Sequence, residues 1–337
     1  MRNAIQTLLD ELSSQNDNRT SVFDVQIKEL DNETLSLSGR LLNANQLPAL
    51  EESFWEQFPD LRLDTASIKV LDRPNLPCFH VATNLTGLYE KPTFSMPLSS
   101  ELTYGTELEI LDETGNWVFT KQADGYLGWA YKRYLTEGEA STATHLVIAP
   151  SYELRTEPDE TSSVLTRIMS GTAIRLEETQ NEWTKVVANK TGWIPSKYLR
   201  AISDIPKTIE EKRKILMEDA ICMIGTPYLW GGTTGNGIDC SGFARLLHHW
   251  VGVQIPRDAD MQSDAAKHIE PPYEVGDLLF FAEIDSNRKI THVGVSLGGW
   301  KLIHSSRSNN GVYADDLQQR KSLMDIFVNA GSFIREA

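Results

Sequence analysis

Cys240 lies where a cysteine could act as a nucleophile. The glycine-rich stretch 231–237 comes just before it, and Asp239-Cys-Ser-Gly then leads into apolar residues at helical spacing. We therefore expect Cys240 at or near the amino terminus of a helix. Unpaired amide groups and the helix dipole stabilise a thiolate there, and the thiolate is the nucleophilic form of cysteine. The sequence thus predicts a cysteine nucleophile.

A nucleophilic cysteine needs a base, and histidine is the usual one. His248 and His249 follow Cys240 along the same predicted helix. At about 1.5 Å per residue they lie roughly 12 Å away and cannot reach it. His292 and His304 lie instead on later predicted strands, 289–297 and 300–305. We expect the base to be one of these two.

The register of this predicted hairpin decides whether the two histidines can meet. If Gly298-Gly299 is a strict two-residue turn, His292 opposes Ser305 and His304 faces away. If the loop is odd and centred on Gly298, the histidines oppose each other, with Cβ atoms about 5 Å apart on one face. We expect the second arrangement, in which one ring orients the other as in a catalytic triad.

The flanking segments predict a mixed domain of helices and strands. Thr208-Ile-Glu-Glu is a capping box that starts a helix, and Ile224-Gly-Thr-Pro ends it. Residues 275–281 are typical of a further strand. The region 208–337 is therefore expected to form one α+β domain.

The middle of the chain contains an internal repeat. Several features return 66 positions later: Leu88 as Leu154, Pro92 as Pro158, Gly105 as Gly171, and Trp117 as Trp183. After a two-residue deletion at a predicted hairpin tip, 123–126, a Gly-Trp…Tyr-Leu ending also returns. Each copy, 78–136 and 145–200, is a string of short strands, which predicts two small β-barrels.

Residues 1–72 predict a separate small α/β domain. An amphipathic helix at 1–12 precedes a strand pair at 22–27 and 34–38, a helix ending near Pro59, and a strand at 61–71. This order of elements resembles a BON-type module. We expect it to serve in packing or as a spacer.

Composition narrows the classes of function. A chain of 337 residues with 40% hydrophobic and 23% charged residues is long enough for several globular domains. Its net charge of −15 argues against a nucleic-acid partner and, less strongly, against an anionic cell wall. No apolar run approaches the ~20 residues of a membrane helix, and residues 1–12 lack a signal-peptide core. We expect a small soluble substrate and no membrane association.

The cysteine count and the absence of cofactor motifs add two expectations. Cys78, Cys222 and Cys240 cannot all pair, so a reducing cytoplasmic setting fits best, and the first two are expected to be small buried side chains. The sequence contains no P-loop, no dinucleotide fingerprint and no zinc-ligand spacing. We therefore expect no cofactor and no metal.

Several motifs together resemble the NlpC/P60 cysteine peptidases. They are Pro227-Tyr-Leu-Trp-Gly-Gly, Asp239-Cys-Ser-Gly, Ile255-Pro-Arg, Val275-Gly-Asp-Leu and Thr291-His-Val-Gly-Val. The resemblance covers 208–337 and implies a papain-like α+β core. It implies Cys240 as nucleophile, His292 as general base and then acid, and His304 as the orienting third residue. The two repeats resemble bacterial SH3 domains.

The domain order is similar to that of muropeptide-recycling γ-D-glutamyl-L-diamino-acid endopeptidases. Those enzymes cleave between D-Glu and the diamino acid, usually meso-diaminopimelate, in small peptides with a free L-Ala amine. The resemblance implies a cytoplasmic enzyme that acts on small muropeptides, with no obligate protein partner.

The same resemblance implies a set of substrate-binding residues. They are Tyr228, Trp230, Asp239, Ser241 and Asp258 in the peptidase region, with Glu90 and Tyr126 in the first repeat. Tyr228 is expected to help hold the substrate or the oxyanion, together with the amide of Cys240. An acidic group suits the substrate ammonium because a carboxylate accepts a charge-assisted hydrogen bond. Ala259 stands where we expect a serine, which puts one substrate contact in doubt.

Two alternatives remain from the sequence. One is an exported endopeptidase that remodels the intact wall. The other is a non-catalytic protein in which the SH3-like repeats bind the cell wall and the peptidase domain is vestigial. The intact set of Cys240, His292 and His304 argues against the second.

Overall fold

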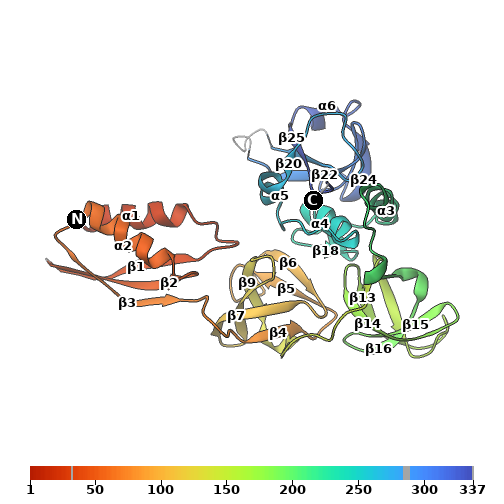
Figure 1. Cartoon of the computed structure of the whole chain (residues 1–337), viewed down its shortest axis with the longest axis horizontal. Coiled ribbons are helices and arrows are strands. Elements are labelled where there is room, and N and C mark those ends of the chain that lie inside the picture. The colour runs from red at the N-terminus through yellow and green to blue at the C-terminus, as the bar shows by residue number, and fades with distance from the viewer. Residues whose placement is uncertain (32, 284–288, 336–337) are drawn as a thin grey trace. The chain divides into compact units, whose positions relative to one another are not determined.

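The computed structural model describes residues 1–31, 33–283 and 289–335 (Figure 1). The chain divides into two compact units. Unit 1 comprises 1–79 and 107–132, and unit 2 comprises 80–106 and 133–337. The last two residues of the predicted peptidase domain lie outside the described residues.

The amino-terminal part of unit 1 contains the elements predicted for 1–72. They are α1 (Arg2–Ser14), β1 (Phe23–Leu30), β2 (Thr34–Leu41), α2 (Gln46–Gln57) and β3 (Arg62–Val70). The sheet order is β1-β2-β3, with an antiparallel first pair and a parallel second pair. Both helices pack on one face of this sheet, where Ile5 and Phe54 meet Leu35 in a shared core (Figure 1). The assignment to a BON-type module stays a prediction.

The first repeat contributes strands to both units. Unit 1 holds the antiparallel strands β7 (Glu107–Thr114), β8 (Trp117–Lys121) and β9 (Leu127–Tyr131). Unit 2 holds the antiparallel pair β5 (Leu85–Tyr89) and β6 (Leu98–Thr103), with β10 (Leu135–Glu137); β4 (Cys78–Val81) spans the boundary. The predicted hairpin tip is the loop between β8 and β9. Closure into a barrel stays a prediction.

The second repeat lies wholly in unit 2. Its sheet has the strand order β13-β12-β16-β15-β14-β11-β17. These strands are β11 (His145–Val147), β12 (Ser151–Arg155), β13 (Val164–Met169), β14 (Ala173–Gln180), β15 (Trp183–Val187), β16 (Thr191–Pro195) and β17 (Leu199–Ala201). Trp250 Nε1 donates to Val147 O at 2.9 Å, and Gly235 N donates to Ser170 Oγ at 2.9 Å. The repeat is therefore bonded directly to the carboxy-terminal part of unit 2.

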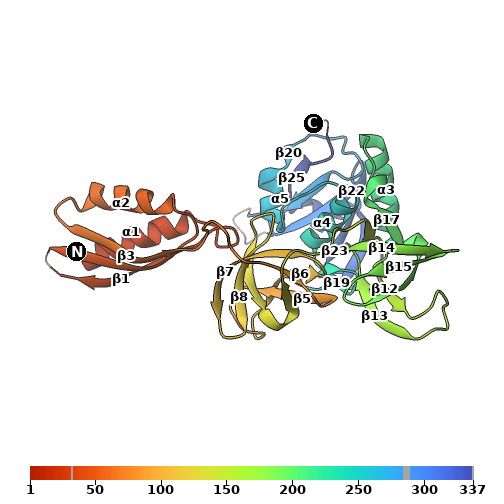
Figure 2. The same cartoon turned by 60° about the horizontal axis from the view of Figure 1, so that its bottom comes forward.

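The carboxy-terminal part of unit 2 is a six-stranded sheet with helices. The order β20-β25-β21-β22-β23-β24 joins strands that are distant in the sequence. Its elements are α3 (Ile209–Cys222), β18 (Thr233–Thr234), β19 (Gly237–Ile238), α4 (Cys240–Trp250), α5 (Ala259–Ala265), β20 (Lys267–His268), β21 (Leu278–Phe281), β22 (His292–Gly298), β23 (Lys301–Ser306), β24 (Gly311–Asp316), α6 (Lys321–Met324) and β25 (Phe327–Ser332). Helix α4 lies against β22 and β23, packing Phe243 and Leu247 with Val293 and Ile303 (Figure 2).

Two predictions about local structure need correction. The strand predicted at 275–281 begins only at Leu278, because Gly276 adopts a positive φ of 88° and turns the chain. Cys222, expected to be buried, is exposed because it is the last residue of α3, and Cys78 is only partly buried. The capping box is confirmed, since Thr208 accepts from Glu211 N.

Within the described residues, no helix combines the length and the apolar character needed to cross a bilayer.

Candidate active site

Cys240 is the first residue of α4, as the sequence predicts. Asp239 caps this helix, because its Oδ1 accepts from Gly242 N at 2.6 Å and its Oδ2 accepts from Gly231 N at 3.0 Å. A Cβ at Gly242 would lie 2.4 Å from Gly232 O, so only glycine fits the first turn against the preceding loop. The cap and the glycines together fix the position of the Cys240 thiol at the start of α4.

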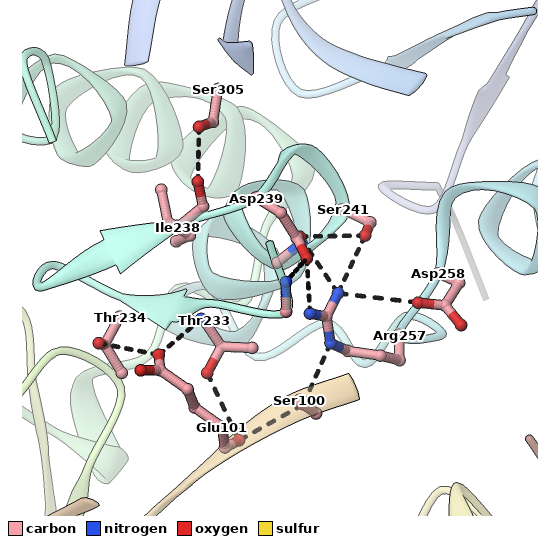
Figure 3. A network of polar contacts seen from close by, with 12 residues as sticks. Ser100, Glu101, Thr233, Thr234, Ile238, Asp239, Ser241, Arg257, Asp258 and Ser305 are labelled. Atoms are coloured by element: carbon pink, nitrogen blue, oxygen red, sulfur yellow. Dashed lines mark hydrogen bonds and ion pairs between the residues drawn. The ribbon is translucent and has the colours of Figure 1, made fainter. Parts of the chain in front are cut away.

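A buried arginine that the sequence did not predict as a site residue lies beside Asp239 and Ser241, the two neighbours of the nucleophile in the sequence (Figure 3). Arg257 is 1% exposed, and its Nη2 and Nη1 reach the two carboxylate oxygens of Asp239 at 2.7 and 3.2 Å. Its Nη1 also donates to Ser241 Oγ at 3.0 Å, and its Nε to Ser100 Oγ at 3.1 Å. Such a bidentate pair adds geometric specificity as well as energy. The side chains of Asp239 and Ser241 therefore hold the start of α4, and their predicted contact with substrate stays untested.

Glu101, on β6 of the first repeat, connects that repeat to the loop before Cys240. Its Oε2 accepts from Thr233 N at 2.8 Å and from Thr234 Oγ1 at 3.0 Å (Figure 3). Burial raises the pKa of this carboxyl, against the lowering effect of the two hydrogen bonds. Two neighbouring residues of β6 thus support the cysteine segment, Glu101 by direct hydrogen bonds and Ser100 through Arg257.

The two predicted histidines are in contact. His292 Nε2 lies 2.7 Å from His304 Nδ1, and the ring centroids are 4.9 Å apart. His304 Nε2 lies 3.0 Å from Asp315 Oδ2 on β24, and Arg320 donates to the other carboxylate oxygen. Asp315 was not predicted from the sequence. A carboxylate next to the second histidine extends the predicted pair to a chain of three groups.

The hairpin that carries these histidines differs from the prediction. Gly298 pairs with Lys301, so Gly299-Trp300 forms the turn, and Leu297 bulges out of the pairing just before it. Both glycines adopt positive φ, 103° and 62°, which lets the chain reverse one residue later than expected. The predicted odd loop centred on Gly298 is therefore wrong.

The bulge nevertheless keeps the histidines on one face. Ser296 pairs with Leu302, and the same register continued by two residues puts His304 opposite Gly294. His292 is then the diagonal neighbour of His304 rather than its direct partner. A Cβ at Gly294 would lie 2.3 Å from Leu302 Cδ1 and 3.4 Å from His304 Cβ, so a larger residue there would displace the end of the Leu302 side chain beside His304.

Asp315 determines which ring nitrogens carry protons. The hydrogen bond from His304, joined by that from Arg320, lowers the pKa of Asp315 to about 2. An ionised carboxylate only accepts, so His304 Nε2 must donate and its Nδ1, when the ring is neutral, must accept. His292 Nε2 therefore donates to His304. The lone pair of His292 is left on Nδ1.

Burial favours the neutral form of both the thiol and the first histidine. Burial, reinforced by the charge of Asp239, raises the pKa of Cys240 to about 12. Hydrogen bonds from the backbone N–H groups of Val293 and Ser241 to the sulfur lower this pKa. Because Val293 follows His292 in β22, the first of these bonds places the thiol beside the strand that carries His292. Burial, joined by His304, lowers the pKa of His292 to about 3.

Comparison with known proteins bears on this site. Residues 225–328 match the model of the NlpC/P60 family. The chain carries an NlpC/P60 domain. Residues 88–132 match a bacterial dipeptidyl-peptidase Sh3 domain and 152–200 a bacterial SH3 domain, so two SH3 domains precede it. The predicted family resemblance is confirmed.

Named relatives of the chain are peptidases. It is 28% identical to a "Gamma-D-glutamyl-L-lysine dipeptidyl-peptidase" of Bacillus cereus, over 64% of this chain and 69% of that protein. It is also 28% identical to "Dipeptidyl-peptidase 6" of Lysinibacillus sphaericus, over 72% and 93%. A crystal structure of an NlpC/P60 family protein from Bacillus cereus matches with a TM-score of 0.67 at 22% identity, covering 77% of this chain and all 100% of that one. That structure supports the fold, and the relatives support a peptidase.

The other predicted site residues are distributed more widely. In the NlpC/P60 domain, Tyr228 is half-buried, Trp230 is 57% exposed, and Asp258 precedes α5 with its Oδ1 3.9 Å from Arg257 Nη1. The described residues contain no cluster of three or more His, Cys, Asp or Glu side chains that could hold a metal.

The two residues predicted in the first repeat lie in different units. Glu90 is exposed just after β5 in unit 2, whereas Tyr126 is buried in the loop between β8 and β9 in unit 1. Their predicted contacts with a substrate amine stay predictions.

Proposed function

We propose that this chain is a cysteine endopeptidase of peptidoglycan recycling. It cleaves the bond between γ-D-Glu and meso-diaminopimelate in short stem peptides with a free L-Ala amine, releasing L-Ala-γ-D-Glu in the cytoplasm. The observation that carries the proposal is the chain His292–His304–Asp315, which leaves the Nδ1 lone pair of His292 free, on the residue before the Val293 N–H that bonds the Cys240 sulfur. The relatives named as γ-D-glutamyl-L-lysine dipeptidyl-peptidases support the bond chosen.

The first half of the reaction forms a thioester. His292 Nδ1 takes the thiol proton as Cys240 Sγ attacks the γ-carbonyl carbon of D-Glu. The carbonyl oxygen becomes negative and accepts from the Cys240 N–H and the Tyr228 hydroxyl. The imidazolium of His292, stabilised through His304 by the Asp315 carboxylate, gives its proton to the diamino-acid nitrogen as the C–N bond breaks.

The second half regenerates the thiol. Neutral His292 takes a proton from a water molecule, which attacks the thioester carbon. The C–S bond breaks, the sulfur regains a proton from His292, and L-Ala-γ-D-Glu leaves with a carboxylate in place of the amide. Because His292 is neutral at rest, it can act as base in both halves.

The selectivity for a free amine is assigned to acidic groups. Glu90 of the first repeat is our candidate, with Trp230 and Asp258 in the peptidase domain. A carboxylate binds an ammonium through a charge-assisted hydrogen bond, and an acylated amine loses that charge. Substrates with a blocked amine should therefore be poor.

Mass spectrometry of the products tests this function. The full chain is incubated with L-Ala-γ-D-Glu-meso-diaminopimelate and, separately, with its N-acetyl form. We expect L-Ala-γ-D-Glu and free diaminopimelate from the first, little cleavage of the second, and none of either by Cys240→Ala. Equal cleavage of both peptides would refute the free-amine requirement. Release of soluble fragments from purified sacculi would favour a wall-remodelling enzyme instead.

A further inference from the structure

The glycine-rich segment, residues 231–237, is in close contact with both SH3 repeats. A Cβ at Gly231 would lie 2.3 Å from the backbone oxygen of Leu98, the first residue of β6 in the first repeat. A Cβ at Gly235 would lie 2.3 Å from the backbone oxygen of Pro150, just before β12 in the second repeat. Both contacts lie within unit 2. The segment therefore approaches each repeat backbone to backbone, at a position that leaves no room for a side chain.

Hydrogen bonds reinforce the contact on each side. In the first repeat, Glu101 Oε2 accepts from Thr233 N at 2.8 Å and from Thr234 Oγ1 at 3.0 Å (Figure 3). In the second repeat, Ser170 Oγ accepts from Gly235 N at 2.9 Å. Each repeat thus supplies a side-chain acceptor to a backbone N–H group of the segment. Because a hydrogen bond to a carboxylate is stronger than one between neutral groups, we expect Glu101 to contribute more than Ser170.

The segment in turn holds the start of α4. The short strands β18 and β19 pair within it and just after it. Asp239, which caps α4, bonds the segment twice: its N–H donates to Gly232 O at 3.1 Å, and its Oδ2 accepts from Gly231 N at 3.0 Å. Cys240 is the next residue and the first of α4. A shift of the segment would therefore move the nucleophile.

The position of the nucleophile relative to its base controls the rate of attack. Ser305 Oγ donates to Ile238 O at 2.6 Å, which bonds the backbone before Cys240 to β23 (Figure 3). The same strand carries His304, the partner of the base His292. A misplacement of about 1 Å can lower a rate about 100-fold. Contacts that fix the segment therefore bear on the chemical step.

We propose that the two SH3 repeats hold the glycine-rich segment in the conformation that presents Cys240, with Glu101 and Ser170 as positioning residues. Neither residue is assigned a contact with substrate, since both act through the segment. The inference rests on the proposed function in taking Cys240 as the nucleophile. It goes beyond that function because it gives the second repeat a part in catalysis rather than in binding a cell wall.

Single-turnover kinetics separate this role from substrate binding. The substrate is the coumarin amide of L-Ala-γ-D-Glu, and the full chain is present in excess. The dependence of coumarin release on protein concentration gives the acylation rate constant and an apparent Kd. The variants are Glu101→Ala, Glu101→Gln, Ser170→Ala, and a double variant with both alanine substitutions.

Two control variants lose comparable hydrogen bonds that stay inside the second repeat. Ser196 Oγ lies 2.7 Å from Thr184 Oγ1, and Glu153 accepts from Arg155 and Arg167. Ser196→Ala and Glu153→Ala should therefore match the parent in both constants.

Glu101→Ala is expected to lower the acylation rate constant about 10- to 100-fold, with little change in the apparent Kd. Ser170→Ala should lower it about 2- to 10-fold, the size of one neutral hydrogen bond. Glu101→Gln should recover most of the rate, because its amide oxygen can still accept from Thr233 and Thr234. Since both residues act on one segment, the double variant should fall by less than the product of the two single falls.

Several results would overturn the inference. A raised apparent Kd with an unchanged rate constant in Glu101→Ala would make Glu101 a substrate contact instead. Glu101→Gln as slow as Glu101→Ala, or a double variant that falls by the full product, would contradict the shared positioning role. An unchanged rate constant in either single alanine variant would overturn the inference while coumarin release by the parent still supports the proposed function. Failure of the parent to release coumarin would overturn both.

Discussion

Asp315 acts on the reaction through two imidazole rings. It holds the proton of His304 on Nε2, and His304 in turn holds the proton of His292 on Nε2. Without the carboxylate, His304 can change tautomer, and His292 then spends part of its time with a proton on Nδ1. In that form it cannot accept the proton of the thiol.

Asp315→Ala should therefore lower kcat with little change in KM. We expect a fall of about 10- to 100-fold, similar to the effect of removing a partner that orients a functional histidine. The 15N spectrum of the histidine side chains should show the Nε2–H tautomer of His292 in the parent and a mixture in the variant. Asp316→Ala, which removes the neighbouring carboxylate at the end of β24, is the control and should leave both unchanged. An unchanged tautomer and kcat in Asp315→Ala would contradict the role.

The pKa values predict how the resting thiol reacts. Cys240 has a raised pKa, so the thiolate fraction is small at neutral pH and grows about tenfold per pH unit. His292 has a lowered pKa, so it carries no proton with which to stabilise a thiolate above about pH 3. Alkylation of Cys240 by iodoacetamide should rise steadily between pH 6 and pH 9, the range in which we propose to measure it.

Peptide mapping at Cys240 in a Cys222→Ser background measures this rate, because Cys222 is exposed and would otherwise compete. A rate that stays constant down to acidic pH would instead indicate a thiolate–imidazolium pair at rest.

The sequence identifies some residues of the site and not others for a physical reason. Cys240 and the two histidines are rare residue types whose local patterns, a glycine-rich loop and a hairpin, could be interpreted without a fold. Asp315 is one of 47 acidic residues, and its role depends on the pairing of β23 with β24. Arg257 stood within a recognised motif, but its partners Asp239 and Ser100 are 18 and 157 positions away.

At the scale of elements, α4 begins at Cys240 because contacts with residues outside the helix hold its first turn. The ion pair of Arg257 and Asp239 is buried, with side chains 1% and 9% exposed. Removing one partner of such a pair leaves an uncompensated buried charge. The carboxylate that caps α4 would then carry that charge alone.

Arg257→Met should therefore destabilise the start of α4 by about 3–5 kcal/mol. Hydrogen exchange of peptides that cover α4 measures the free energy of local opening in the intact chain. The control Arg175→Met removes a partly exposed pair with Glu177 in the second repeat and should cost about 0–1 kcal/mol. Equal protection of α4 in both variants would show that the pair does not hold this helix.

The hairpin of β22 and β23 illustrates what the sequence leaves open within an element. Two consecutive glycines mark the reversal, but they permit several registers, and the bulge at Leu297 decides among them. The two histidines share a face in the observed register and in the one predicted, so the functional conclusion survives the error.

At the scale of the whole molecule, the repeats were visible because duplicated features recur at a constant offset. The helices and strands of 1–72 were also predictable, since the periodicity of apolar residues and the turn residues are local signals. The division of the first repeat between the two units was not, because it depends on contacts that strands make at long range. The contacts of Glu101 with Thr233 and of Ser100 with Arg257 arise in the same way.

The central claim is that Cys240 carries the acyl group during peptide cleavage. Rapid quenching in acid after mixing with L-Ala-γ-D-Glu-meso-diaminopimelate, followed by intact-mass measurement and peptide mapping, tests it directly. The account predicts an L-Ala-γ-D-Glu adduct on Cys240 that is present in the parent and in Cys222→Ser and absent in Cys240→Ala, which forms no product. Product formation by Cys240→Ala, or an adduct on any other residue, would contradict it.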